Sequence, residues 1–275
     1  LRFGGPLDLF SRRRFRQAVT QDKPDIVLTW MSRATAACPA VPMHVARLGG
    51  YYDLKRYRHC QHLIGNTKGI ARWLVEQGWP ADRAHYLPNF VDATPAAPRP
   101  KRGKVVLALG RLHPNKGFDL LIEAMVRVPK ARLWLLGDGP LGSELRDLAR
   151  ELNVDDRVEF LPWVDDPAPY YTAADVVCVA SRIEPLGNVV LEAWAHGKPV
   201  VASLADGPVE LIRDGETGLL ADAEQPDRLA AALRRVLDSP DLAAQLAAHG
   251  RAAHEAEFTE HAVVAAYLDL FRRLS

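Results

Sequence analysis

The sequence predicts an α/β fold made of two doubly wound domains, each with a parallel sheet. The apolar runs are continuous and rich in valine and leucine, as in strands that helices cover on both faces. Several runs end in a glycine-containing loop followed by a helical segment, which is the order of a βαβ unit. The chain has 275 residues, of which 48% are hydrophobic, and this is enough for two cores.

The elements fall into two groups along the chain. The N-terminal domain, residues 1–92, has expected strands at 26–30, 44–48, 62–65 and 85–87. Residues 93–103 contain prolines and alanines without usable periodicity and are the predicted linker. In the C-terminal domain, residues 104–257, strands are expected at 104–110, 131–136, 157–161, 175–181 and 199–202. Its later helices are expected at 188–196, 227–237 and 241–257, and a last helix follows at 260–274.

Two cations flank a loop at the end of the first strand of the C-terminal domain. Arg111 and Lys116 stand between Gly110 and Gly117, and a helix begins after this loop. A guanidinium binds phosphate oxygens with its planar fork and a lysine ammonium binds them as a point charge, so a diphosphate suits the pair. The other interpretation is that they are two ordinary loop cations.

Two carboxylates bracket a later junction between a strand and a helix. Glu184 stands beyond the carboxyl end of the strand, and Glu192 shares a polar stripe with Asn188 and His196, at every fourth position of the helix. Ligands of doubly wound sheets bind at such junctions. The plain alternative is that Glu184 is a solvated loop carboxylate and that Glu192 complements the helix dipole.

A third strand end carries Gly137-Asp138-Gly139-Pro140. Glycines at this place allow a tight turn and the close approach of a ligand to the backbone. The spacing fits neither a Walker loop nor a dinucleotide fingerprint, so the motif alone is a weak indication of function.

Together these motifs resemble the retaining glycosyltransferases of group one, family four, which have the GT-B fold of two Rossmann-like domains. The order and spacing of the motifs match from about residue 87 onward. The motifs that carry the resemblance are Leu87-Pro88-Asn89-Phe90-Val91-Asp92, Gly110-Arg111-Leu112 with Lys116-Gly117, Gly137-Asp138-Gly139-Pro140, the segment from Glu184 to Glu192, and Gly215-Glu216-Thr217-Gly218-Leu219-Leu220.

The resemblance implies a donor site in the C-terminal domain. Arg111 and Lys116 would hold the nucleotide diphosphate and stabilise the charge that grows on it during transfer. Glu184 would orient the donor sugar, and Glu192 would accept hydrogen bonds from the ribose hydroxyls. Trp163 either stacks on the base or belongs to the core. The residues expected around the nucleotide, Glu192 aside, are Gly110, Gly137, Asp138, Gly139, Trp163, Val164, Leu186, Gly187, Asn188 and Val189.

The resemblance also implies that the N-terminal domain takes the acceptor and that residues 258–275 return toward that domain. The chain opens at Leu1. Members of the family usually begin with a strand followed by a glycine-rich loop, and this sequence contains no counterpart of these two elements. We therefore expect an incomplete N-terminal domain. The strand end Trp30-Met31-Ser32-Arg33 offers no histidine or acid, so no acceptor-side catalytic residue can be transferred from the family.

The resemblance implies no metal and no cofactor apart from the donor substrate, for which a uridine diphosphate sugar is favoured. The carboxylates Asp165 and Asp166 are adjacent rather than spaced for a metal, and two cations replace its charge. The other metal candidate is His59-Cys60-Gln61-His62, whose spacing can supply two or three ligands to zinc. No second ligand cluster accompanies it in the sequence.

Charge is divided unequally between the two domains. Residues 1–92 hold 14 Lys/Arg against 7 Asp/Glu (+7), and residues 93–275 hold 21 against 27 (−6), which gives the net charge of +1. A basic acceptor-side domain indicates an anionic glycan or glycolipid acceptor, or contact with an anionic membrane surface. The segment Phe10-Ser11-Arg12-Arg13-Arg14-Phe15-Arg16 either lies on such a surface or is a solvated helix face. No nucleic-acid recognition motif is present.

The expected activity is sugar transfer from a nucleotide diphosphate sugar to a hydroxyl, with retention, in the assembly of a cell-envelope glycan such as lipopolysaccharide. Only three cysteines and no long apolar span indicate a cytoplasmic protein, with at most peripheral contact with the inner face of the membrane. Two alternatives remain open: a truncated, noncatalytic module that binds nucleotide sugars, and a GT-B epimerase or hydrolase that needs no acceptor.

Overall fold

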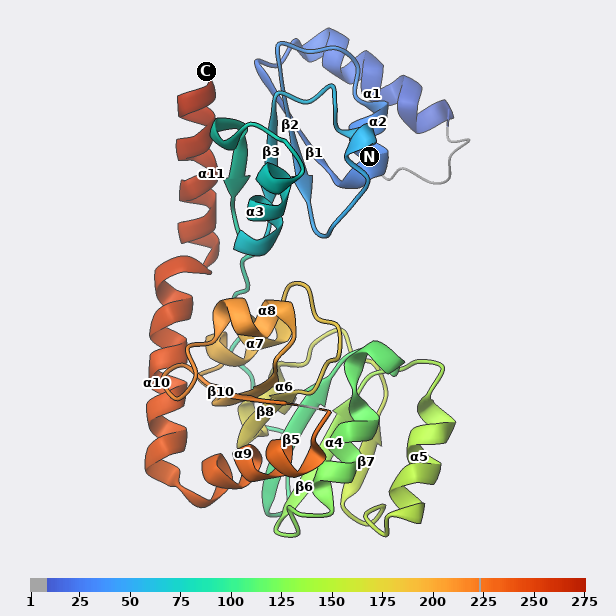
Figure 1. Cartoon of the computed structure of the whole chain (residues 1–275), viewed down its shortest axis with the longest axis vertical. Coiled ribbons are helices and arrows are strands. Elements are labelled where there is room, and N and C mark those ends of the chain that lie inside the picture. Colours follow the sequence, from blue (N-terminus) through green and yellow to red (C-terminus); the bar gives the residue numbers. More distant parts are fainter. Residues whose placement is uncertain (1–8, 223) are drawn as a thin grey trace. The chain divides into compact units, whose positions relative to one another are not determined.

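The computed structural model describes residues 9–222 and 224–275, and the chain divides into two compact units (Figure 1). The N-terminal unit comprises the residues up to Asn89 together with Val263–Ser275, and the C-terminal unit comprises Phe90–Ala262. Each unit contains one parallel sheet, so the α/β class with two parallel sheets is confirmed.

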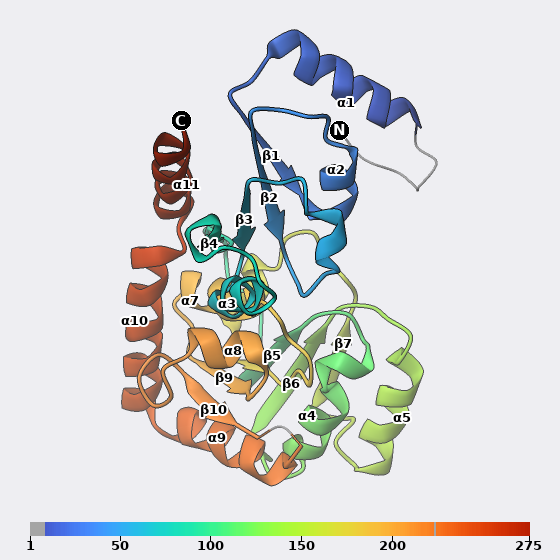
Figure 2. The same cartoon turned by 45° about the horizontal axis from the view of Figure 1, so that its top comes forward.

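The sheet of the N-terminal unit has four strands in the order β1-β2-β3-β4. The strands are β1 (Ile26–Trp30), β2 (Met43–Leu48), β3 (His62–Gly65) and β4 (Ala84–Tyr86). The helices are α1 (Leu9–Asp22), α2 (Met31–Ala37), α3 (Lys68–Glu76) and, from Val263 onward, α11 (Glu260–Leu274), with single turns η1 (Leu54–Arg56) and η2 (Ala81–Arg83). Both faces of the sheet are covered. Leu63 packs with residues of α3 on one face, and Ile64 packs with Leu270 of α11 on the other. Helix α1 lies to one side of the strands (Figure 2).

The sheet of the C-terminal unit has six parallel strands in the order β10-β9-β8-β5-β6-β7. The strands are β5 (Lys104–Leu109), β6 (Ala131–Leu136), β7 (Val158–Leu161), β8 (Val176–Val179), β9 (Val200–Ser203) and β10 (Leu219–Ala221). The helices are α4 (Phe118–Met125), α5 (Gly142–Glu151), α6 (Ala168–Ala173), α7 (Asn188–Ala195), α8 (Asp206–Leu211), α9 (Pro226–Asp238) and α10 (Pro240–Glu257), with one turn, η3 (Pro114–Lys116).

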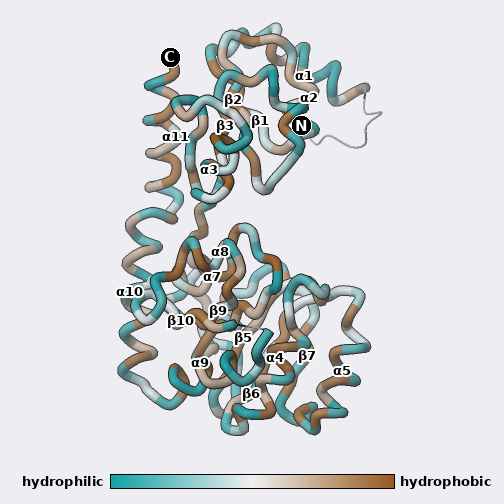
Figure 3. Tube along the Cα trace, in the orientation of Figure 1, coloured by the Kyte–Doolittle hydropathy of each residue, from teal (hydrophilic) through white to brown (hydrophobic). Residues whose placement is uncertain are grey.

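Alternate residues of the central strand β5 enter different cores. Val106 and Ala108 pack with α4, α5 and α9, whereas Val105 and Leu107 pack with α6 and α7. Because both faces of the strand are buried, each of these positions needs an apolar side chain, which explains the continuous apolar run. An outer helix has only one buried stripe, and α5 accordingly alternates between hydrophilic and hydrophobic colours in Figure 3.

The predicted strands are confirmed, with ends displaced by one or two residues. The first strand of the C-terminal unit ends at Leu109, because Gly110 has a φ of +145° and begins the loop. The predicted strand 175–181 is shorter and forms β8 (Val176–Val179). Among the helices of residues 9–222 and 224–275, none combines the length and the hydropathy needed to cross a bilayer.

Candidate functional site

The C-terminal sheet has a topological switch point between β5 and β8. From β5 the chain adds β6 and β7 on one side, and then β8, β9 and β10 on the other. The loops that follow β5 and β8 therefore diverge and leave a crevice at the carboxyl ends of these two strands. The first loop carries Arg111 and Lys116, and the second carries Glu184, so the predicted charged residues lie at the switch point.

An ion pair joins these two loops. Lys116 Nζ donates to Glu184 Oε2 across 2.5 Å. Ser181 Oγ donates to the same oxygen across 3.3 Å, and the backbone N–H of Gly187 donates to Oε1 across 3.3 Å. Glu184 is only 9% exposed, so its interpretation as a solvated loop carboxylate is wrong. The ion pair fixes the two loops against each other, because breaking it would leave a nearly buried carboxylate without its cation.

Glu192 lies one helical turn inside α7, with its carboxylate against the ring of Tyr171. Tyr171 Oη donates to Glu192 Oε2 across 2.5 Å, and the Tyr171 ring stacks on His196 with a centroid distance of 4.9 Å. Burial raises the pKa of Glu192 above its usual value, and the Glu184 carboxylate raises it further, while Tyr171 and Lys116 lower it. Glu192 is thus a partly desolvated acceptor that is held in one orientation.

A cavity of about 300 Å³ opens beside these residues, within the size range of small-molecule sites. Its walls come from the ends of β5 and β6, the loop after β7, and α7. The lining residues are Leu109, Gly110, Lys116, Leu136, Trp163, Val164, Asp165, Pro167, Val189 and Glu192. Six of them were expected from the sequence: Gly110, Lys116, Trp163, Val164, Val189 and Glu192. The fold thus brings together residues from four separate segments.

Several residues expected in the site lie around the cavity rather than in its lining. Arg111 is exposed next to Gly110, and Leu186 and Asn188 are half-buried in the turn that enters α7. Gly187 is the N-cap of that helix and has a φ of +72°, which favours glycine. The first turn of α7 adjoins the cavity through Val189, which lines it. That this helix end binds an anion stays a prediction.

Trp163 is a surface residue of the loop after β7. Its side chain is 64% exposed while it contributes to the cavity wall, so its interpretation as a core residue is wrong. The backbone N–H of Trp163 donates to Asp138 Oδ2 across 3.1 Å. Asp138 therefore holds the tryptophan loop in place from outside the cavity lining.

The glycines after β6 allow two loops to touch. A Cβ on Gly137 would lie 2.0 Å from the carbonyl oxygen of Gly110, and one on Gly139 would lie 2.4 Å from that of Leu112. The sequence predicted that these glycines admit a ligand, whereas in the structure they admit the backbone of the loop that follows β5.

Sequence reasoning missed Tyr171, which orients Glu192. It also missed four lining residues as parts of the site: Leu109, Leu136, Asp165 and Pro167. A tyrosine next to Tyr170 in a short amphipathic segment gives no signal of its own, because its role arises only when α6 and α7 pack together.

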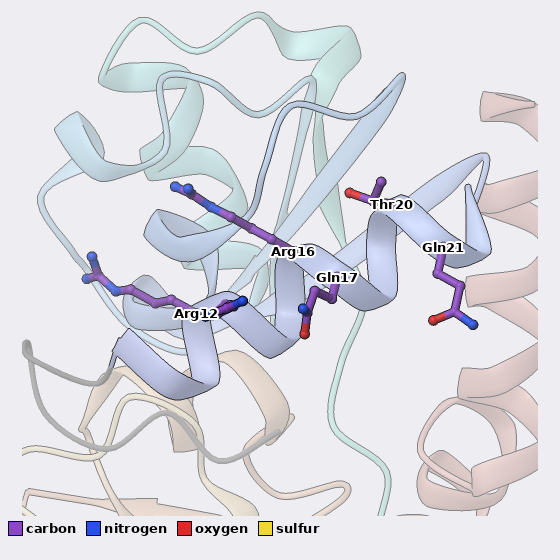
Figure 4. Close-up of a pocket in the computed structure, with 6 residues that line it drawn as sticks. Arg12, Arg16, Gln17, Thr20 and Gln21 are labelled. Atoms are coloured by element: carbon purple, nitrogen blue, oxygen red, sulfur yellow. The ribbon is translucent and has the colours of Figure 1, made fainter.

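The basic segment predicted near the N-terminus forms α1. Phe10 is 76% exposed, and the residues that line a surface hollow along this helix are Arg12, Arg13, Arg16, Gln17, Thr20 and Gln21. Figure 4 shows Arg12 and Arg16 extending from α1. The helix therefore presents a cationic surface with an exposed aromatic side chain.

The group of metal-ligand residues in the structure differs from the one that the motif His59-Cys60-Gln61-His62 suggested. His62 is not part of the ligand group that contains His59 and Cys60. Its Nδ1 instead lies 2.9 Å from His85 Nε2. His44 takes its place: ligand atoms of His44, His59 and Cys60 lie within 4.8 Å of one another. One residue from outside the motif, rather than a second ligand cluster, thus completes the group of three.

The sequence profile of the group 1 glycosyl transferases matches residues 103–239. The lipopolysaccharide core biosynthesis glycosyltransferase LpsE of Rhizobium meliloti is 36% identical over 267 residues, which are 94% of this chain and 78% of that protein. The chain belongs to the group 1 glycosyltransferases. The lipopolysaccharide core biosynthesis glycosyltransferase LpsD of Rhizobium meliloti is 37% identical over 270 residues, which are 94% of this chain and 78% of that protein.

The crystal structure of HepE from Anabaena in complex with UDP is similar to this glycosyltransferase, with a TM-score of 0.79 and 22% identity. The similarity covers 94% of this chain and 81% of that chain. The fold is therefore the GT-B fold that the resemblance implied, and the chain is a glycosyltransferase of that architecture.

Proposed function

We propose that this glycosyltransferase is a retaining enzyme of family four that binds a nucleotide diphosphate sugar, with a uridine diphosphate sugar favoured, in the cavity of its C-terminal unit. One observation carries the proposal: the cavity has Lys116, Glu192 and the exposed ring of Trp163 in its walls. These three groups match the diphosphate, the ribose hydroxyls and the base of a nucleoside diphosphate. HepE, whose crystals contain UDP, supports this choice of ligand because it shares the fold.

The diphosphate would bind between Lys116, Arg111 and the amino end of α7. Lys116 Nζ already lies in the crevice, and the exposed Arg111 is one residue from the cavity lining at Gly110. The backbone amides of Asn188 and Val189 add the positive end of a helix dipole, while that of Gly187 donates to Glu184 Oε1. When the bond between the sugar and the diphosphate breaks, charge builds on the leaving oxygen, and these groups stabilise it electrostatically.

Glu192 and Trp163 would hold the nucleoside part. The Glu192 carboxylate accepts hydrogen bonds from two ribose hydroxyls, and Tyr171 keeps the carboxylate in position from behind. The indole of Trp163 covers one face of the base, while Val164 contributes apolar contact. Asp138, Gly137 and Gly139 would support this loop rather than touch the nucleotide.

Glu184 would orient both the donor sugar and Lys116. Its contacts to Lys116, Ser181 and Gly187 fix the junction between the two loops, with acceptor capacity left for sugar hydroxyls. Retention then follows from attack of the acceptor oxygen on the face that the diphosphate leaves. The C1–O bond to phosphate breaks, the new C1–O bond forms, and the acceptor proton passes to the diphosphate. No resident metal is required in this scheme, because Lys116 and Arg111 supply the positive charge.

The acceptor we propose is an anionic glycan or glycolipid of the cell envelope, such as a lipopolysaccharide. The names of LpsE and LpsD support this class, and so does the charge of +7 (14 Lys/Arg less 7 Asp/Glu) on residues 1–92. We assign the reaction to the cytoplasmic side of the inner membrane, with α1 in contact with anionic headgroups.

Vesicle sedimentation tests this surface role. Substituting Gln for Arg12, Arg13 and Arg16 should reduce binding to anionic vesicles at low salt, whereas the same change at the exposed Arg228, Arg234 and Arg235 of α9 should leave it unchanged. Equal binding by both triple variants would refute membrane contact through α1.

The proposed activity is tested by calorimetric titration with uridine, guanosine and adenosine diphosphate sugars, followed by transfer assays with envelope glycolipids. We expect saturable binding of one nucleotide class and a product whose anomeric configuration, read by NMR, matches that of the donor. Inversion would refute the retaining assignment. Binding without turnover by any acceptor would favour a noncatalytic module, and conversion of the donor without acceptor would favour an epimerase or hydrolase.

A further inference from the structure

Two histidines and a cysteine meet in the N-terminal unit. His44 is the second residue of β2, and His59 and Cys60 precede β3. One ligand atom of each lies within 4.8 Å of those of the other two. His44 and Cys60 are buried, whereas His59 is exposed. The cluster lies near the amino ends of β2 and β3, and the loops at the carboxyl ends are not involved in it.

Hydrogen bonds fix the proton positions of both imidazoles. His59 Nε2 lies 3.0 Å from the backbone oxygen of Thr35, and a carbonyl oxygen only accepts, so Nε2 carries the proton. In the neutral imidazole the other ring nitrogen, Nδ1, then has a lone pair. Metal-bound histidines typically donate their outer N–H to such a carbonyl, which fixes the tautomer and the orientation of the ring.

The same reasoning applies to His44 through a chain of hydroxyls. Thr35 Oγ1 donates its one proton to the backbone oxygen of Met31, so Thr29 Oγ1, 3.0 Å away, must donate to Thr35. The oxygen of Thr29 then accepts from His44 Nε2 across 2.8 Å. His44 Nδ1 is left with a lone pair, and it lies 3.6 Å from Cys60 Sγ.

This separation matches a tetrahedral metal site. Zinc holds imidazole nitrogen at about 2.0–2.1 Å and thiolate sulfur at about 2.3 Å, so two such ligands of a tetrahedron lie roughly 3.6 Å apart. A thiolate with two imidazoles is a ligand set that favours zinc over magnesium or calcium. His59 is exposed, and its ligand atom lies within 4.8 Å of both other ligand atoms.

Among the residues that the structure describes, Cys38 is a neighbouring thiol outside the group of three, whose ligand atoms alone lie within 4.8 Å of one another. Its backbone N–H donates to the oxygen of Thr35 across 3.1 Å, and this is the same oxygen that binds His59 Nε2. Cys38 is a free, half-buried thiol at the end of α2. Structural zinc sites use four protein ligands, and two cysteines with two histidines are a common combination.

We propose that His44, His59 and Cys60 bind a structural zinc ion, with Cys38 as the fourth ligand. The ion would connect the end of α2, the start of β2 and the segment before β3. Cys60 belongs to the same core cluster as Leu63 and Ile70, so the site lies beside that core. Binding energy at such a site adds to folding energy, since the unfolded chain does not hold the ligands in place.

The wild-type chain, purified without chelators in the presence of a reductant, should contain about one zinc per chain by elemental analysis. After removal of the metal, titration with Co²⁺ should produce a thiolate-to-cobalt charge-transfer band that zinc then abolishes. The melting temperature should fall on addition of EDTA and recover with zinc. Absence of the cobalt band in a folded wild-type chain, or another transition metal in place of zinc, would overturn the proposal.

Substitutions separate the ligands from the fold. His59→Asn is at an exposed position and should lose the metal while keeping the circular dichroism spectrum, whereas His249→Asn, at an exposed position of α10, should keep the metal. Cys38→Ser should weaken zinc binding in competition with a chromophoric chelator, and Cys178→Ser, in buried β8, is the matched cysteine control. Unchanged zinc affinity in His59→Asn would overturn the site.

Thr29→Val tests the hydroxyl chain. The side chains have similar shape, so the variant removes the acceptor of His44 Nε2–H without opening a cavity. Loss of such an outer contact typically weakens metal binding roughly 10- to 100-fold. An unchanged affinity in Thr29→Val would contradict the tautomer assigned to His44.

Discussion

Replacing Glu192 by glutamine should move ligand affinity and the stability of the free protein in opposite directions. The amide keeps the shape of the side chain and can still accept from Tyr171, which donates to the carboxylate across 2.5 Å. It removes the negative charge that we propose binds the ribose hydroxyls. Hydrogen bonds to charged groups contribute about 1.5–3 kcal/mol, so the Kd for uridine diphosphate should rise roughly 10- to 150-fold.

The effect on stability follows from the raised pKa of Glu192. Burial, the largest cause, and the nearby Glu184 carboxylate both favour the protonated form. The folded chain therefore binds this proton more tightly than the unfolded chain. The stabilisation from the proton is present below the pKa of the unfolded state and is lost as pH rises through the folded pKa. At neutral pH the charge destabilises the fold, so Glu192→Gln should raise the melting temperature of the ligand-free protein.

Calorimetry and thermal denaturation measure the two effects, with Glu123→Gln on α4, a half-buried carboxylate outside the cavity lining, as the control. In the wild type, affinity for the nucleotide should decrease as pH falls through the raised pKa of Glu192, and in Glu192→Gln this decrease should vanish. An unchanged Kd in Glu192→Gln, or a ligand-free variant less stable than the wild type at neutral pH, would refute the reasoning.

Three further substitutions address the other walls of the site. Trp163→Ala should weaken nucleotide binding by about 1–3 kcal/mol, the usual contribution of stacking on a base, and equal affinity in a calorimetric titration would refute stacking. Lys116→Ala should lower kcat about 100- to 1000-fold and change the donor Kd much less, because the charge that Lys116 stabilises develops in the transition state. Steady-state kinetics measure kcat and calorimetry measures Kd. An equal loss in kcat and in donor affinity would contradict this role. Gly137→Ala should destabilise the fold more than Gly103→Ala in urea denaturation. A Cβ at Gly137 meets the oxygen of Gly110 at 2.0 Å, whereas one at Gly103 meets nothing within 4 Å. Equal denaturation midpoints would show that the two loops separate at little cost.

The strands of the C-terminal unit could be predicted because a strand that is buried on both faces appears in the sequence as a continuous apolar run. Val105, Val106 and Leu107 are all buried, and a run of this kind is visible without knowledge of the fold. The order of the strands and the right-handed crossover then bring the loops at Lys116 and Glu184 together at the switch point. Much of the candidate site was therefore accessible from sequence pattern and general topology.

What could not be predicted depends on packing between distant segments. The sequence does not show whether Trp163 is inside or outside, because a tryptophan suits both environments. The hydrogen bond from Tyr171 to Glu192 arises where α6 meets α7. His44 joins His59 and Cys60 only because β2 and β3 pair in register, with Val45 opposite His62. Motif spacing within one short segment assigned His62 to that group instead.

A crystal structure of this glycosyltransferase grown with uridine diphosphate tests the central claim most directly. We expect the base against Trp163, the ribose hydroxyls within hydrogen-bond distance of Glu192, and the diphosphate between Lys116 and the amino end of α7. Uridine diphosphate bound elsewhere, or with its phosphates away from Lys116 and α7, would contradict the account.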